Sequence, residues 1–545
     1  MSTRRAWPVP LVLALLAVWL AATWLTPDVM RQQRNILTLV GVGSAAILIL
    51  AWFVGLSGAP RRLRFGVLAA VLGPIAAAGV LLRIRGVSGD LVPILEWRLG
   101  AHEAPAGAGA PSPLPPERSE PSAAAAPSTE PSATPAERTA VTEPTAGVLA
   151  PVAARAARRP GDFPQFLGPN RDGTLRGPRL TRDWAARPPR RLWRRTVGEG
   201  WSGFAVVGDR AVTQEQRGPE ERVVAYDLRA GQVLWTHADA ARFDGVIAGV
   251  GPRATPAIAD GRVFTMGATG VLNALDLASG RALWTRSVIE ENGGQQPQWG
   301  KSGSPLVVGS RVVVSAGGPD GRSLVAYDAA TGAPAWRAGS DRASYSSPFV
   351  ARLAGRTVLV VLNDASLAGH DPETGALLFE QPWPSGNPSV AVPALLGGDR
   401  LLASAGYGVG SKAYLVAAHA DGTLEATMQW ESPRLKSKFA NLVVFQGLVY
   451  GLDDGVFTCL DPATGERRFK GGHFGHGQLL LVDDLLLVQT EEGEVLLLEP
   501  GPDEARERAR FSALDGKTWN PPALAGSILL VRNDREAAAY DLPVD

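Results

Sequence analysis

Hydrophobic residues follow two different patterns along the chain. The first hundred residues contain three long apolar stretches, at about 9–24, 36–57 and 65–82. Each is close to the length that an α-helix needs to cross the hydrocarbon core of a bilayer. Because no small-residue cleavage site follows the first stretch, we expect all three to be retained as transmembrane helices, in a membrane anchor over residues 1–100.

The region 101–160 shows neither a helical nor a strand pattern. Between Pro105 and Pro151 the sequence contains eleven prolines and no aromatic residue, among Ala, Ser, Thr and Glu. Such a composition cannot bury enough apolar surface to offset the entropy lost on ordering. We therefore expect a disordered linker that tethers the following domain to the anchor.

From Gly161 onwards, short apolar segments alternate with turn residues, and one motif recurs. Asp227, Gly231 and Trp235 stand four residues apart, and an aspartate, a glycine and an aromatic residue repeat this spacing four more times. These further copies begin at Asp276, Asp328, Asp371 and Asp461. The aspartate can accept backbone N–H bonds in a turn, the glycine supplies a positive φ, and the aromatic ring can pack between sheets.

The motif also counts the repeats. Weaker copies extend the series of marker positions to 227, 276, 328, 371, 421, 461, 499 and 541, at intervals of 38 to 52 residues. One interval is the length of a four-stranded propeller blade. An apolar strand precedes each marker, from Phe204 to Pro522, and a small residue stands two positions before each strand, as expected where backbones converge on an axis.

The two ends of this region predict how the ring closes. Residues 192–195 form a strand with no blade before it, and the chain stops soon after Tyr540. Pairing of these strands would remove an open sheet edge. The sequence therefore predicts an all-β eight-bladed β-propeller over 161–545, preceded by three transmembrane α-helices and the disordered linker. Seven blades with one degenerate hairpin is the competing count.

These residues resemble a known family. The Asp-x-x-x-Gly-x-x-x-Trp unit resembles the repeat of pyrroloquinoline-quinone-like, or quinoprotein alcohol dehydrogenase-like, β-propellers, and it is also similar to that of the propeller lipoprotein of outer-membrane protein assembly. Residues 163–173, Phe-Pro-Gln-Phe-Leu-Gly-Pro-Asn-Arg-Asp-Gly, resemble the start of a bacterial membrane-anchored group of such repeat proteins. The resemblance extends from Gly161 to the end of the chain and is specific for the fold rather than for a function.

The resemblance implies pyrroloquinoline quinone, held with calcium in the axial funnel above a vicinal cysteine pair. The chain has one cysteine, Cys459, which excludes that pair, and no calcium-ligand set matches residue by residue. His473 and His476 stand close in sequence, but no acidic residue or cysteine accompanies them in the repeat pattern. We expect no bound quinone, no metal and no catalytic residues.

The strand alignment instead predicts a binding site at one end of the axis. The side chains three residues before each strand, with nearby lysines, form an aromatic and cationic column. The candidate site at this funnel mouth comprises Trp201, Arg253, Lys301, Tyr345, Lys438, His476, Lys517 and Trp519. Such a surface suits a planar or anionic ligand, a sugar or an acidic peptide. In the alternative interpretation, the aromatic rings only close the channel and the lysines reach solvent.

Charge changes this picture little. The formal net charge of +1 gives no reason to expect nucleic acid, and arginines are balanced on the two sides of the three apolar stretches, so the positive-inside rule does not fix orientation. We expect a noncatalytic binding or scaffolding propeller in the bacterial inner membrane, facing the periplasm or cell exterior and binding a protein or another envelope component. The alternatives are a membrane-tethered quinoprotein oxidoreductase and a carbohydrate-binding propeller.

Overall fold

The computed structural model describes residues 8–26, 31–98 and 161–545, apart from positions 246 and 248. The predicted linker, 101–160, therefore lies outside the described residues. Those described in 1–98 and 161–545 belong to one compact unit.

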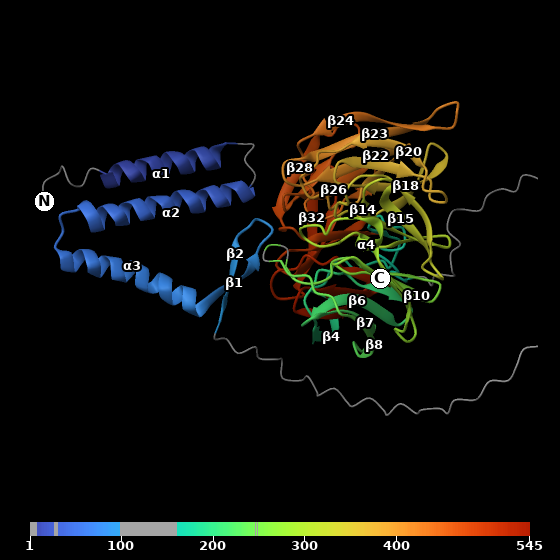
Figure 1. Cartoon of the computed structure of the whole chain (residues 1–545), viewed down its shortest axis with the longest axis horizontal. Helices are drawn as coiled ribbons and strands as arrows, with labels where there is room; N and C mark the ends of the chain where they lie inside the picture. The colour runs from blue at the N-terminus through green and yellow to red at the C-terminus, as the bar shows by residue number, and fades with distance from the viewer. Residues whose placement is uncertain (1–7, 27–30, 99–160, 246, 248) are drawn as a thin grey trace, which may run out of the picture. The chain divides into compact units, whose positions relative to one another are not determined.

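Three apolar helices open the described chain, close to their predicted positions. They are α1 (Pro8–Leu25), α2 (Arg31–Leu56) and α3 (Arg61–Leu81), and each is long and apolar enough to cross a membrane. Helices α1 and α2 lie side by side (Figure 1), where the indole nitrogen of Trp19 donates to the carbonyl oxygen of Leu37 at 3.0 Å. Their side chains are largely exposed, as expected of surfaces that face lipid.

A short β-hairpin that the sequence did not predict follows α3. Strand β1 (Leu82–Val87) pairs antiparallel with β2 (Pro93–Trp97). The connecting turn is closed by backbone bonds of 2.9 Å, from Ser88 N to Val92 O and from Leu91 N to Ser88 O. We call residues 87–91 the hairpin turn.

Within the described part of 161–545, the strands form eight sheets. Strands β6, β7 and β8 of one of these sheets are drawn in green (Figure 1). The first four sheets are β5 (Ala205–Val207), β6 (Arg210–Arg217), β7 (Glu220–Asp227) and β8 (Val233–Asp239); β9 (Ala257–Ala259), β10 (Arg262–Met266), β11 (Val271–Asp276) and β12 (Ala282–Ser287); β13 (Leu306–Val308), β14 (Arg311–Gly318), β15 (Arg322–Asp328) and β16 (Pro334–Ala338); and β17 (Phe349–Leu353), β18 (Arg356–Leu362), β19 (Ser366–His370) and β20 (Leu377–Pro382). A one-turn helix, α4 (Val288–Asn292), follows β12.

The other four sheets continue the same order. They are β21 (Ala394–Gly397), β22 (Arg400–Ala405), β23 (Gly410–Ala418) and β24 (Leu424–Ser432); β25 (Val443–Phe445), β26 (Leu448–Asp453), β27 (Val456–Leu460) and β28 (Arg467–His473); β29 (Gln478–Val482), β30 (Leu485–Gln489), β31 (Glu494–Pro500) and β32 (Ala505–Ser512), with β3 (Thr174–Leu175) added beside β29; and β33 (Ala523–Ala525), β34 (Ile528–Arg532) and β35 (Glu536–Asp541), completed by β4 (Arg190–Thr196). Except for the parallel pair of β3 and β29, neighbouring strands in these sheets are antiparallel. Consecutive four-stranded antiparallel sheets are the architecture of a β-propeller.

The recurring motif joins one sheet to the next. Asp227 ends β7 and its Oδ1 accepts from the backbone nitrogens of Arg229 and Ala230, as the sequence predicts. The Trp235 indole nitrogen then donates to the carbonyl oxygen of Leu277 in the following sheet, at 2.9 Å, and its ring covers Gly280. The same indole-to-carbonyl bond to the next sheet is made by Trp193, Trp284, Trp336 and Trp430.

The first strand of the region closes the last sheet, as predicted. Strand β4 pairs with β35 over six positions, with Trp193 opposite Ala539. Arg532 of β34 is fully buried and stabilises this closure. Its guanidinium donates to the carbonyl oxygens of Gln214 at 2.8 Å and Gly198 at 3.0 Å. The last sheet is therefore completed by the strand that leads into the first sheet, and a buried cation joins it to β6 of the first sheet.

The first strands of neighbouring sheets contact one another in five places: β5 with β9, β9 with β13, β21 with β25, β25 with β29, and β33 with β5. Residues 163–173 run across the inner strands of four sheets. Phe163 bridges Val206 of β5, the Pro164 carbonyl accepts from Ile258 of β9, and Arg171 donates to the carbonyl oxygens of Ser304 and Pro305 just before β13. The segment then continues into β3 beside β29. The family-like segment thus has a structural role, which is to cover one end of the inner strands.

Candidate functional site

A cavity of about 240 Å³ lies at the other end of the inner strands, where the loops that precede them converge. Its lining contains five of the eight predicted site residues: Trp201, Arg253, Tyr345, Lys438 and Trp519. Ser302, Val390 and Phe439, which stand three residues before other aligned strands, also line it, as does Phe166 of the segment 163–173. The repeat alignment therefore brought together side chains up to 318 positions apart in sequence. We call the propeller residues of this lining, together with the neighbouring His476, Glu491 and Lys517, the funnel mouth.

One side of the funnel mouth is an aromatic cluster. The ring of Trp519 lies 5.0 Å from that of Trp201 and 4.8 Å from that of Phe439. Lys517 Nζ stands 4.1 Å from the Trp519 ring centre and 4.7 Å from that of Trp201, a cation–π arrangement. Phe439 in turn meets His476 edge-on at 5.5 Å. The rings pack on one another and on a cation.

The opposite side contains two aromatic residues that sequence reasoning missed. Trp299 lies 5.5 Å from Tyr345 and 6.2 Å from Tyr407, ring centre to ring centre. Both lie outside the aligned column: Trp299 precedes its column residue by three positions, and Tyr407 lies in the Gly-rich turn between β22 and β23. Their ring planes are 23° apart, nearly parallel.

The predicted cations differ in their placement. Lys438 Nζ stands 4.9 Å from the Tyr407 ring centre, and burial lowers the pKa of this amine. Arg253 donates to the Gly249 carbonyl at 2.8 Å, and burial lowers its pKa to about 10. Lys301 points away from the cavity: its amine donates to the carbonyl oxygens of Ser315 and Ala316, and burial lowers its pKa to about 7. Lys301 and Lys438 are buried, so they do not reach solvent as the alternative interpretation required.

The carboxylate at the funnel mouth was not predicted from the sequence. Glu491 is 7% exposed and accepts from the Trp519 indole nitrogen and from the backbone nitrogen of His476, both at 2.9 Å. It follows β30 and has no equivalent in the motif, so periodicity could not identify it. The bond to Glu491 holds the indole of Trp519 in place, and the carboxylate oxygens can still accept further hydrogen bonds.

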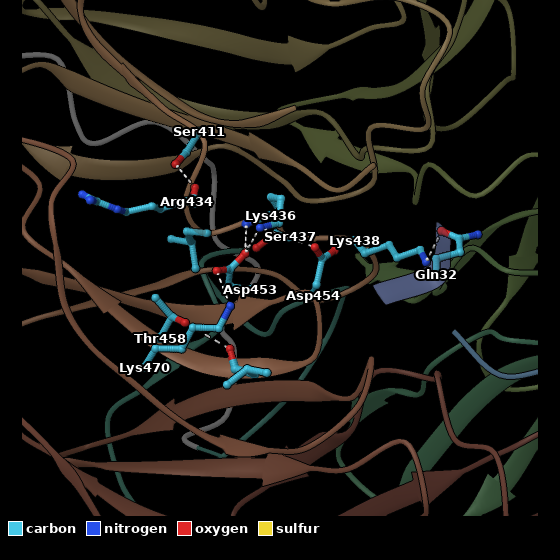
Figure 2. A network of polar contacts seen from close by, with 12 residues as sticks. Gln32, Ser411, Arg434, Lys436, Ser437, Lys438, Asp453, Asp454, Thr458 and Lys470 are labelled. Atoms are coloured by element: carbon cyan, nitrogen blue, oxygen red, sulfur yellow. Dashed lines mark hydrogen bonds and ion pairs between the residues drawn. The ribbon is translucent and has the colours of Figure 1, made fainter. Parts of the chain in front are cut away.

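A second polar network lies behind Lys438. Figure 2 shows Lys436 and Lys470 on either side of Asp453, at 3.0 and 2.6 Å, whereas Lys438 extends toward Gln32. Burial alone would raise the pKa of Asp453, but the two lysines together lower it. The paired charges of this network are mutually neutralising and support the loop that carries Lys438.

These residues do not fit a calcium-bound quinone. Calcium is held by six to eight oxygen ligands, usually with several carboxylates. In the described part of the chain no group of three His, Cys, Asp or Glu side chains is placed to hold a metal ion. The carboxylate of Glu491 already accepts from two donors of the propeller.

Comparison with known proteins identifies the family of this chain. The family model described as outer membrane protein assembly factor BamB matches residues 184–290 and 219–471, which together span more than half of the chain. Quinohemoprotein alcohol dehydrogenase ADH-IIG of Pseudomonas putida is 30% identical over 131 residues, which are 22% of this chain and 17% of that protein. The matched segment thus spans a small part of that relative.

Two solved structures match the chain at low identity. BamB from Moraxella catarrhalis is 18% identical, with a TM-score of 0.35, and the alignment covers 64% of this chain and 86% of that one. Quinohemoprotein alcohol dehydrogenase ADHIIG from Pseudomonas putida is 12% identical, with a TM-score of 0.42, over 71% of this chain and 81% of that one.

Proposed function

Because this chain belongs to the propeller family described as that of the outer membrane protein assembly factor BamB, we propose that it is a membrane-anchored, noncatalytic binding and scaffolding propeller of the bacterial cell envelope. In this proposal the eight sheets are eight blades over 161–545, residues 1–100 are the anchor, and 101–160 are the linker. The predicted funnel-mouth residues, except Lys301, form the binding site.

The observation that carries the proposal is the chemistry of the funnel mouth. Its polar groups are the ammonium groups of Lys438 and Lys517, which can donate to carbonyl oxygens, and the carboxylate of Glu491, which can accept from amides. Between them stand aromatic rings that bury apolar surface. Backbone carbonyls, backbone amides and small apolar side chains are the groups of a polypeptide, so the mouth suits a protein segment.

A carbohydrate ligand is less well supported. Sugar rings stack on open aromatic faces, whereas Trp519 is flanked by Trp201, Phe439 and Lys517. We therefore propose a protein partner rather than a polysaccharide.

The oxidoreductase alternative is tested by quinone binding. The purified full chain in detergent is titrated with pyrroloquinoline quinone in the presence of calcium, and bound quinone is measured by absorbance after removal of the free quinone. We expect no calcium-dependent stoichiometric binding. One quinone per chain, with dye reduction on addition of an alcohol, would overturn the proposal.

Orientation is tested separately. The end of α1, the start of α2 and the end of α3 fall on one face of the membrane if each helix crosses once. We propose that this face and the propeller are periplasmic. Alkaline phosphatase fused after Asp545 should then be active, and a folded fluorescent protein that matures only in the cytoplasm should be dark at the same position. The reverse pattern would place the propeller in the cytoplasm.

A further inference from the structure

The funnel mouth contacts the chain's own hairpin turn. Val87, Ser88, Gly89 and Leu91 complete the lining of the cavity. They belong to the same compact unit as the propeller strands.

Three charged groups at the mouth bond to the backbone of this turn. The Lys438 ammonium donates to the Gly89 carbonyl oxygen, and the Lys517 ammonium donates to the Val87 carbonyl oxygen at 3.2 Å. Glu491 accepts from the Gly89 backbone nitrogen at 2.6 Å. The mouth therefore binds both the backbone N–H and the carbonyl oxygen of one residue, Gly89, which is recognition of backbone.

The funnel mouth also contacts one side chain of the turn. Asp90 Oδ1 lies 3.3 Å from His476 Nε2. His476 is 2% exposed, held by Phe439 and by the bond from its own backbone nitrogen to Glu491. The imidazole of His476 therefore faces a side-chain oxygen on the residue that directly follows Gly89.

The position of Gly89 accepts no side chain. A Cβ added there would lie 2.6 Å from Cγ of His476, inside the imidazole ring's contact distance. Gly89 has no positive φ, so the turn itself does not require glycine at this position. Glycine is required because the backbone at this position lies close to the ring of His476, which is buried and held by two contacts. An alanine here would leave the free hairpin intact and clash only in the bound state.

Contacts outside the turn strengthen the same arrangement. Gln32, at the start of α2, accepts from Lys438 at 3.1 Å, and Asn35 donates to the Asp90 carbonyl at 3.1 Å. Glu96 of β2 pairs with Arg535 at 2.9 Å. Because turn and mouth belong to one chain, their encounter is intramolecular and gains the high effective concentration of a tethered ligand.

We propose that the funnel mouth recognises a tight polypeptide turn in which glycine is followed by an acidic residue, and that residues 87–91 are its resident ligand. The bound turn latches the propeller to the membrane anchor. A partner that presents the same Gly-Asp chemistry must displace this turn, so the turn regulates access to the mouth. This regulatory part rests on the proposed function of the mouth as a binding site, whereas the latch itself does not.

The latch is tested by cutting the chain between anchor and propeller. A protease site is introduced at positions 125–131 of the full chain, which is reconstituted in nanodiscs of phosphatidylethanolamine and phosphatidylglycerol. After cleavage, the rate at which the propeller leaves the nanodisc is measured. We expect the wild-type propeller to stay bound, and Gly89→Ala to leave at least about tenfold faster, because the clash acts only on the bound state.

Gly79→Ala in α3 is the matched control, since a Cβ there meets nothing within 4 Å. It should be retained like wild type. Equal release of wild type and Gly89→Ala would overturn the latch, and so would equal retention, which would mean that lipid or other contacts hold the propeller. Thermal unfolding of the propeller should be the same in all three proteins. A failure of the latch leaves the quinone titration unaffected, so the two proposals fail separately.

Discussion

The contact between a tryptophan of one sheet and the marker glycine of the next can be isolated with two glycines of a single sheet. Gly280 has φ +73° and Gly261 has φ +72°, but a Cβ on Gly280 would lie 2.6 Å from Cδ2 of Trp235, whereas a Cβ on Gly261 meets nothing within 4 Å. Both alanine variants bear the same backbone strain, about 1–2 kcal/mol. Only Gly280→Ala must also displace the Trp235 ring, at about 1–3 kcal/mol more.

The free energies of unfolding of both variants and of wild type are measured by urea titration of the full chain in detergent, followed by tryptophan fluorescence. The slopes of the transitions should agree, which licenses comparison of the midpoints. We expect Gly261→Ala to lose about 1–2 kcal/mol and Gly280→Ala about 2–5 kcal/mol. Equal losses would refute the claim that the motif's glycine exists to seat the tryptophan of the preceding sheet.

Two further predictions concern buried cations. Arg532→Met should lower the free energy of unfolding, measured with urea, by about 2–5 kcal/mol, because it leaves the buried carbonyl oxygens of Gln214 and Gly198 without a donor. Arg506 forms an exposed ion pair with Glu504, so Arg506→Met should cause no comparable loss. A loss of equal size in Arg506→Met would contradict the argument for closure. Burial lowers the pKa of Lys301 to about 7, below its value of about 10.4 in the unfolded chain, so the unfolded state binds more protons between these values and stability should rise with pH across that window. Lys301→Met should flatten this rise, and an unchanged pH profile would show that Lys301 is not buried as described.

Much of the propeller was predictable because its repeat is local. Asp227, Gly231 and Trp235 each have one physical role, and those roles recur at a fixed spacing, so the sequence carries the turn, the strand and the contact between sheets together. The three apolar helices were predictable for a similar reason, since length and hydropathy alone define them. The pairing of β4 with β35 followed from the general need to remove an open edge.

The parts that escaped prediction depend on contacts far apart in sequence. Glu491 lies outside the motif and belongs to the candidate site only because Trp519 and His476 converge on it. Residues 163–173 could be recognised as family-like, but their course across four inner strands follows from Arg171 reaching carbonyl oxygens more than 130 positions away. Lys301 was included because it stands next to a column position, but its side chain bonds to the backbone carbonyl oxygens of Ser315 and Ala316.

The hairpin turn was the largest omission from the candidate site. Residues 82–97 are mixed in character, with arginines beside apolar residues, and carry no repeat signal. Their significance arises from Gly89 fitting against His476, a pairing across 387 positions that no local pattern encodes.

The most direct test of the account is whether the funnel mouth binds a Gly-Asp turn. A cyclised peptide of residues 82–97 is titrated calorimetrically into the full-length Gly89→Ala protein, in which the resident turn is weakened. We predict binding of one peptide per chain, lost when the peptide itself carries Gly89→Ala and lost when the protein also carries Lys438→Met. Absence of binding, or binding indifferent to both substitutions, would contradict the claim that the mouth recognises polypeptide backbone.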